Sequence, residues 1–208
     1  MPVLTLTGVT RRFRQGSTVV TALEDTSMTV WPQELAVVQG PSGSGKTTLL
    51  NVLLGWETPD AGTVEGVLAA PDWAAMAVVP QRLGLLEHLT VLDNVALPGR
   101  ATRLRAAPAD LLAELGLAHV TSRFPAEISL GEQQRTACAR AIVTEPRVLL
   151  ADEPTSHQDD TTARLLLDQF RRVAANGSAV VIASHDERLW AEADRRWVIS
   201  GGHLRQDA

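Results

Sequence analysis

The chain has 208 residues, of which 45% are hydrophobic, and a formal net charge of −5 at pH 7. This length and apolar share suit one domain with a well-buried core. Since no apolar run approaches the roughly 18 to 20 residues that cross a bilayer, we expect no membrane-spanning segment. The acidic balance also excludes the broad basic surface that is typical of proteins that bind nucleic acid.

The compartment is indicated by the N-terminus and the cysteine count. Residues 1–7 lack the basic start and apolar centre of a signal peptide, and Cys138 is the single cysteine. A lone cysteine forms no internal disulfide and fits a reducing compartment, so we expect a cytoplasmic protein with Cys138 as an inert packing residue. A small basic cluster, Arg100, Arg103 and Arg105, is interpreted as a solvated loop rather than a docking surface.

The clearest motif is a glycine-rich loop of the form G-x-x-x-x-G-K-[ST], which predicts binding of a nucleoside triphosphate. The apolar run 35–38 before the loop is typical of a buried strand, and residues 48–54 after it are typical of a helix. The glycines let successive backbone N–H groups point at phosphate oxygens, and the helix N-terminus adds partial positive charge. The predicted contacts are Gly40, Pro41, Ser42, Gly43, Ser44, Gly45, Lys46, Thr47 and Thr48.

Two residues of the loop and two acidic residues have specific expected roles. Lys46 reaches the β- and γ-phosphates, and Thr47 coordinates Mg²⁺. An apolar strand pattern ends at Asp152 and Glu153, and the carboxyl ends of strands are where α/β folds place ligands. We therefore expect Asp152 to face the Mg²⁺ and Glu153 to face the water that attacks the γ-phosphate. The alternative is an ordinary surface Asp-Glu pair.

The predicted strands alternate with helices, which favours right-handed crossovers and a mostly parallel sheet. We expect strands at residues 3–9, 27–30, 35–39, 76–79, 148–151, 180–183 and 197–199, and helices at 48–54, 161–175 and 185–193.

Residues 83–144 break this alternation. They contain helical patterns near 110–115 and 131–144 and no convincing strand. The sequence therefore predicts a single domain, 1–208, in which an α-helical subdomain (83–144) is inserted into an α/β core. That core consists of residues 1–82 and 145–208.

Several short motifs in a fixed order complete the pattern. They are Gln81 as a Q-loop glutamine, residues 128–135 as a signature sequence, 156–159 as a D-loop, His185 as a switch histidine, and Phe13 as an aromatic partner for adenine. With the glycine-rich loop, they resemble the ATP-binding subunits of ABC transporters over residues 4–205. The resemblance implies a P-loop NTPase (RecA-like) fold with a mostly parallel sheet, a small antiparallel β part and a helical subdomain.

The resemblance gives roles to three isolated residues, each of which alone would more often be structural. Phe13 stacks on adenine, the alternative being a core phenylalanine. Gln81 ligates Mg²⁺ or orients water where the helical subdomain begins, and His185 donates a hydrogen bond to the γ-phosphate. No metal other than Mg²⁺ is expected, because no metal-ligand spacing is formed by His88, His119, His157 and His203.

A second anion site is expected at the start of the helix predicted after residue 131. Ser129 and Gly131 precede this helix and present a hydroxyl, backbone N–H groups and a positive helix end. In the ABC family the P-loop and the signature of different subunits enclose one ATP. The resemblance therefore implies an ATP-dependent two-fold dimer, either a homodimer or a heterodimer with a second ABC subunit, with Asp159 at its interface.

The chain departs from the family pattern in three places. Leu130 stands where the signature usually has glycine, and Gln158 stands where the D-loop usually has leucine. Because a Ser-Leu-Gly signature also occurs among drug-resistance exporters, we predict an active enzyme. The stretch between Lys46 and Gln81 is short, with a turn at 59–62 and little after it, so we expect part of the antiparallel sheet to be trimmed.

The expected function is Mg²⁺-dependent ATP hydrolysis coupled to transport through a permease on a separate chain. Residues 89–97 and 131–135 look most like the lipoprotein-release, macrolide-export and cell-division branch. The protein is then peripheral on the inner face of the cell membrane and binds no nucleic acid. The alternatives are the ATPase of an amino-acid or metal importer and an ATP-gated regulatory subunit. A soluble ABC protein acting on ribosomes or DNA would usually carry two cassettes or a long coiled coil.

Overall fold

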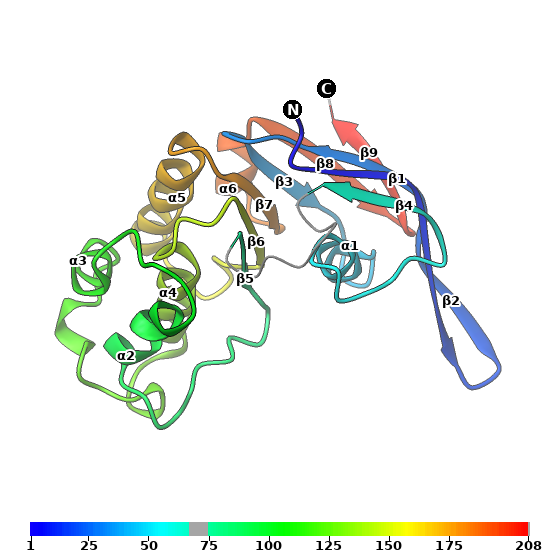
Figure 1. Cartoon of the computed structure of the whole chain (residues 1–208). Helices are drawn as coiled ribbons and strands as arrows, with labels where there is room; N and C mark the ends of the chain where they lie inside the picture. Colours follow the sequence, from blue (N-terminus) through cyan, green and yellow to red (C-terminus); the bar gives the residue numbers. More distant parts are fainter. Residues whose placement is uncertain (67–74, 208) are drawn as a thin grey trace.

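The computed structural model describes residues 1–66 and 75–207, which form two sheets with helices around them (Figure 1). The strands are β1 (Leu4–Gln15), β2 (Thr18–Val30), β3 (Leu35–Gln39), β4 (Ala61–Gly66), β5 (Met76–Val79), β6 (Val148–Asp152), β7 (Ala179–Ala183), β8 (Arg195–Ser200) and β9 (His203–Asp207). The α-helices are α1 (Lys46–Leu53), α2 (Val91–Ala96), α3 (Pro108–Glu114), α4 (Leu130–Ile142), α5 (Asp160–Ala175) and α6 (Glu187–Glu192). Short 3₁₀ helices occupy Leu97–Arg100, Ala118–Val120 and Pro125–Glu127.

The larger sheet has the strand order β5-β6-β7-β3-β8-β9. The strands from β5 to β8 are parallel, and β9 returns antiparallel to β8. The central strands β6 and β7 are buried along their whole length, as their continuous apolar runs predict. This order brings the ends of β3, β6 and β7 to one edge of the sheet. The predicted P-loop NTPase fold with a mostly parallel sheet is confirmed.

The smaller sheet is antiparallel, with the order β2-β1-β4, and much of it was missed by sequence reasoning. The strand predicted at 27–30 begins instead at Thr18 and forms a long hairpin with β1. Residues 18–26 mix polar and apolar side chains and contain no continuous apolar run. They are extended because they pair with β1, which the sequence pattern does not indicate. Figure 1 shows this hairpin projecting from the body of the protein.

The turn expected at 59–62 is wrong at its second half, because β4 already begins at Ala61. Strand β4 pairs with β1, with Val64 opposite Leu6. Five of its six residues are exposed, and the strand therefore leaves almost no apolar signal in the sequence. Strand β9 was missed for the same reason, since it too is largely exposed. Residues 67–74 of the short stretch lie outside the described residues, so the expected trimming of the sheet stays a prediction.

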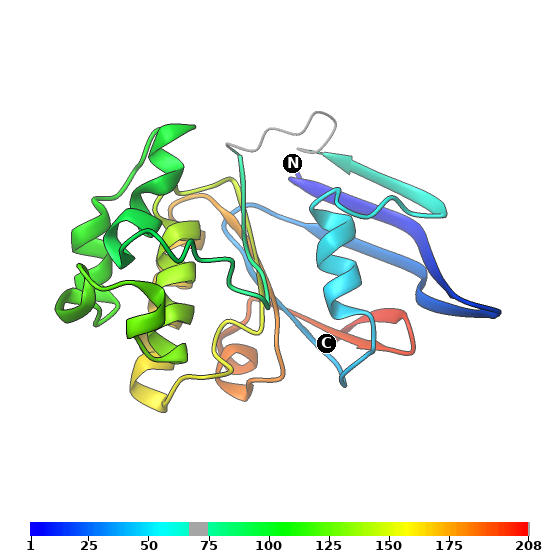
Figure 2. The same ribbon diagram turned by 90° about the horizontal axis from the view of Figure 1, so that it is seen from below.

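Helices cover both faces of the larger sheet, and Figure 2 shows α1 between the two sheets. The apolar side of α1 joins a cluster with β1, β2, β3 and β6, whereas α4 and α5 join a second cluster on the other face. Residues 83–144, all of which the structure describes, contain helices and turns and no strand. In both views α2 to α4 lie at the opposite end of the protein from the β1–β2 hairpin.

The helix ends differ from the predicted ones by a few residues, for local reasons. Helix α1 begins already at Lys46, because Gly45 makes the turn into it with φ of 111°. Helix α6 begins only at Glu187, because the Asp186 side chain accepts a hydrogen bond from the Arg188 N–H and caps the helix.

Candidate nucleotide site

A cleft of about 700 Å³ opens at the edge of the larger sheet where β3, β6 and β7 end. This volume is in the range of sites for small molecules. Most of the predicted site residues line it, namely Gly40, Pro41, Ser42, Gly43, Gly45, Lys46, Thr47, Thr48, Gln81, Asp152, Glu153 and His185. Residues that are distant in sequence are therefore brought together where the motifs predict a nucleotide.

The glycine-rich loop is closely packed against β2 and β8. A Cβ atom on Gly45 would lie 2.3 Å from the Ala22 carbonyl oxygen, and one on Gly40 would lie 2.2 Å from that of Ile199. No residue other than glycine fits these two positions without moving the backbone. The Lys46 ammonium donates to the carbonyls of Gly40 (2.6 Å) and Pro41 (3.1 Å), which keeps its charge within the loop.

Ser44 is the one predicted loop residue that lies beneath the cleft rather than on its wall. It is buried, and its hydroxyl has no hydrogen-bond partner among the described residues. A buried hydroxyl without a partner next to the cleft could donate to a ligand that carries several oxygen acceptors.

Thr47 and Asp152 form the contact that the metal prediction requires. The Thr47 hydroxyl donates to Asp152 Oδ2 over 2.7 Å, although the two residues are 105 positions apart in the sequence. Burial and the neighbouring Glu153 raise the pKa of Asp152, against the opposing effects of the Thr47 hydrogen bond and the Lys46 charge. A hydroxyl and a buried carboxylate this close supply oxygen ligands of the kind that Mg²⁺ prefers.

Glu153 is held in an unusual backbone conformation beside His185. Its φ is 51°, a left-handed value that non-glycine residues rarely adopt and that often marks functional sites. The carboxylate accepts from the Ser184 hydroxyl (3.0 Å) and lies 3.0 Å from His185 Nδ1. Its side chain is 16% exposed, whereas that of His185 is 76% exposed. Glu153 is thus fixed at the wall of the cleft, and His185 reaches out from it.

Several residues of the cleft were missed by sequence reasoning. Ser184, completely buried, orients the Glu153 carboxylate, and its position next to the switch histidine was the only available signal. Leu130 and Gln134 of the signature and Ser156 and His157 of the D-loop also line the cleft, although they were not predicted as site residues. Val20, Thr21, Ala22 and Leu83 carry no motif and reach the cleft only through folding.

Besides Ser44, four predicted site residues do not line this cleft in the part of the chain that the structure describes: Phe13, Ser129, Gly131 and Asp159. Phe13 lies opposite Val20 in the β1–β2 hairpin, and the Arg11 guanidinium lies 4.8 Å from its ring centre. Val20 lines the cleft. Phe13, on the strand paired with that of Val20, therefore lies next to a cleft-lining residue without lining the cleft itself. The other three residues were expected to face a second subunit.

Ser129 begins α4 with a reciprocal cap. Its hydroxyl accepts from the Glu132 N–H (3.3 Å), and both its hydroxyl and its own N–H donate to Glu132 Oε2 (2.8 Å each). The other oxygen of Glu132 lies 3.0 Å from His119 Nε2. Burial would raise the pKa of Glu132, but the Ser129 and His119 contacts outweigh it and lower that pKa. The signature serine is therefore exposed but held in one orientation.

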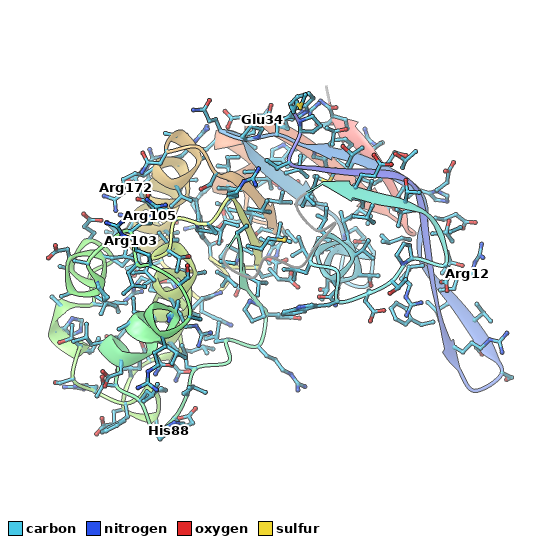
Figure 3. The ribbon with its side chains drawn as sticks, viewed as in Figure 1. Arg12, Glu34, His88, Arg103, Arg105 and Arg172 are labelled. Carbon is cyan, nitrogen blue, oxygen red and sulfur yellow. The ribbon has the colours of Figure 1, made fainter. Side chains whose placement is uncertain are left out.

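Two secondary predictions concern residues away from the cleft. Cys138 is completely buried, and burial raises its pKa to about 12, which confirms its assignment as an inert packing residue. Arg103 and Arg105 lie in an exposed loop at the outer surface beside α3 (Figure 3). In residues 1–66 and 75–207, no helix has both the length and the apolar character needed to cross a bilayer.

The sheet order and the P-loop with its paired Thr47 and Asp152 define a P-loop NTPase. A family profile described as "ABC transporter" matches residues 23–156. The chain belongs to the ABC transporter family.

Two relatives within this family show what the chain is similar to. The chain is 37% identical to the lipoprotein-releasing system ATP-binding protein LolD of Nitrobacter hamburgensis, with 98% of this chain and 95% of the relative covered. It is also 37% identical to the macrolide export ATP-binding/permease protein MacB of Chromobacterium violaceum, covering 99% of this chain. The chain spans only 34% of that MacB protein's length.

A solved structure shows the same architecture. It is described as a dimeric structure of a post-hydrolysis state of the ATP-binding cassette MJ0796 bound to ADP and Pi. The TM-score is 0.89 at 26% identity, with 98% of this chain and 97% of that chain covered.

Proposed function

We propose that the chain is the ATP-binding and ATP-hydrolysing subunit of an ABC transporter for export or release, with its permease on a separate chain. The observation that carries the proposal is a single cleft lined by the P-loop, Asp152, Glu153 and His185. The lipoprotein-releasing and macrolide-exporting relatives support the direction of transport. The protein is then cytoplasmic and peripheral on the inner face of the membrane.

The P-loop binds the triphosphate. Its N–H groups and the N-terminus of α1 attract the phosphate oxygens, and Lys46 swings from the Gly40 and Pro41 carbonyls to the β- and γ-phosphates. Phe13, behind Val20 in the hairpin, supplies an aromatic face for adenine. Binding thus exchanges hydrogen bonds within the loop for charged contacts to the ligand.

Thr47 and Asp152 would hold the metal, and Gln81, two residues beyond the end of β5 and on the wall of the same cleft, would be a third ligand. When bound there, Mg²⁺ would neutralise charge on the phosphates. Asp152 suits this role because its carboxylate is buried and already paired with the loop hydroxyl, so little rearrangement is needed to bind. A bound cation also favours the ionised form, which burial disfavours in the free chain.

Glu153 and His185 act on the reacting end of the nucleotide. The Glu153 carboxylate, oriented by Ser184, accepts a hydrogen bond from the attacking water and polarises it. His185, exposed at the rim, stabilises charge on the γ-phosphate oxygens. The left-handed backbone at Glu153 directs the carboxylate towards Ser184 and His185 instead of along the strand.

A second copy, or a second ABC subunit, closes the cleft. Ser129 and Gly131 at the start of α4 then face the nucleotide held by the partner's P-loop, and Asp159 lies at the interface. The dimeric cassette named above supports this arrangement. The helical subdomain (83–144), entered through Gln81, carries the surface on which the permease docks.

ATP binding can be tested with an unusual property of the sequence. Lys46 is the only lysine in the chain. An amine-reactive reagent therefore modifies only Lys46 and the N-terminal amine, which serves as an internal control. We expect MgATP to protect Lys46 and leave the N-terminus unprotected. Equal modification of Lys46 with and without MgATP would refute binding at the P-loop.

The transport assignment is tested by capture. The tagged Glu153→Gln chain should hold ATP without cleaving it, and it can be isolated from mild-detergent extracts with MgATP. We expect a few-span membrane protein with a large external domain, which should be absent when the bait is Lys46→Ala. A many-span permease would move the assignment to an importer, and ribosomal or DNA-bound partners alone would overturn it.

A further inference from the structure

Gln158 joins the loop after β6 to the first turns of α4. Its side-chain amide donates to the Gly131 carbonyl over 2.9 Å, and its oxygen accepts from Arg135 Nη1 over 2.6 Å. Both hydrogen-bonding ends of the side chain are therefore used. The leucine found here in the family pattern would make neither bond.

Arg135 makes the second of these bonds from an enclosed position. The residue is 8% exposed, and its Nε atom has no hydrogen-bond partner among the described residues. Burial lowers its pKa in spite of the nearby carboxylates of Glu132 and Asp159. A buried guanidinium that lacks hydrogen-bond acceptors destabilises the fold. Loss of the Gln158 oxygen would therefore remove one of the few acceptors that Arg135 has.

The same loop is fixed to α4 at two further points. Gln134 Nε2 donates to the Glu153 carbonyl over 2.6 Å and lies 3.3 Å from the Ser156 hydroxyl. A Cβ atom on Gly131 would lie 2.8 Å from the His157 carbonyl, so backbone meets backbone there. The loop from Glu153 to Gln158 therefore lies directly on the start of α4.

We propose that Gln158 is a positioning residue that clamps the loop carrying His157 and Asp159 to the signature turn, so that both face a second copy of the chain as one unit. The inference rests on the proposed function and deepens it. Gln134 donates to the backbone carbonyl of Glu153, so the backbone at this residue and the surface that faces the partner's nucleotide belong to one hydrogen-bonded unit.

The test compares Gln158→Met, which keeps the volume and loses both hydrogen bonds, with Gln206→Met on the exposed strand β9 as a matched control. In the nucleotide-free chain, we expect hydrogen exchange at residues 154–159 to accelerate in Q158M alone. In the Glu153→Gln background, we expect ATP-driven dimerisation to weaken about tenfold in Q158M. Protection of Lys46 by MgATP should stay unchanged in both variants.

A second variant guards against a general loss of structure. Gln158→Glu keeps an acceptor for Arg135 but loses the donor to Gly131, so we expect its dimerisation to lie between those of the wild-type residue and Q158M. Equal exchange and equal dimerisation in Q158M and Q206M would overturn the clamp. If the chain with Gln158 intact fails to dimerise with ATP, the proposed function is wrong. Hydrogen exchange at residues 154–159 in Q158M and Q206M would then still show whether Gln158 fixes the loop.

Discussion

The two halves of the proposed composite site differ in how they are held. The P-loop half is bonded across the fold, since Thr47 meets Asp152 at 2.7 Å and Glu153 meets Ser184 at 3.0 Å. The signature half is bonded to the loop after β6 through Gln158 and Gln134, and Leu130 at its tip is 49% exposed. The P-loop half is part of the folded core, whereas the signature half is an exposed surface. This difference agrees with the proposal that one chain holds the nucleotide and a second copy covers it.

The largest effect is expected from a change in the P-loop half. Glu153→Gln keeps the size of the side chain but replaces the carboxylate that faces water. We expect phosphate release to fall by about a hundredfold to ten-thousandfold, while MgATP still protects Lys46. A Glu187→Gln change, on the exposed first turn of α6, is the matched control. Turnover that matches this control would show that Glu153 is not the residue that polarises water.

The next variant separates stability from activity at Asp152. Its raised pKa means that its stabilising contribution is full below the unfolded value of 3.8 and is lost as the pH rises through the folded value. Asp152→Asn stays neutral and still accepts from Thr47. We expect a modestly higher unfolding temperature at pH 7 together with lost Mg²⁺-dependent turnover. A lower unfolding temperature at that pH would contradict the burial argument.

A third variant addresses the segment that follows the switch histidine. Burial alone would raise the pKa of Asp186, but hydrogen bonds from Arg188 and Thr155 lower it to about 2. This stabilisation is present above the unfolded value of 3.8 and is lost as the pH falls through about 2.

Asp186→Asn should therefore cost roughly 1.5 to 3 kcal/mol at neutral pH, because charge-assisted hydrogen bonds are lost. Urea unfolding of both proteins at several pH values measures the difference in the free energy of unfolding. We expect this difference to shrink towards acid. A difference that stays constant down to pH 2 would mean that the charge of Asp186 plays no part.

The smallest effect is expected at the signature. Leu130→Gly restores the usual family residue at an exposed position in the first turn of α4. We expect at most about 1 kcal/mol of lost stability and little change in turnover. A rise from no turnover to a normal rate would show that Leu130 blocks the site and that the natural chain is inactive.

The core half could be predicted from sequence because each part has a local cause. The glycine loop, the buried apolar strands and the acidic strand end each carry their own pattern. The register of the sheet, which sets Asp152 beside Ala183 and so brings Glu153 to Ser184, is a long-range property that no local pattern contains.

The surface half was harder to predict. Exposed strands such as β4 and β9 bury little apolar area and leave no periodic signal. Gln158 was recognised only as a departure from a motif, since its partners Gly131 and Arg135 lie more than twenty positions away. The chemistry of a short motif can be predicted from its residue types. Contacts between distant loops can be identified only from the folded structure.

In the proposed dimer, the P-loop of one copy lies against the signature of another, and cross-linking can detect this contact. Cys138 is buried, so Ser42→Cys and Ser129→Cys each supply the only accessible thiol of their chain. The two variants are mixed in the Glu153→Gln background and treated with a short thiol-specific cross-linker. We predict a covalent dimer that forms with MgATP and only in the mixture. No such dimer, while MgATP still protects Lys46, would contradict the two-chain site.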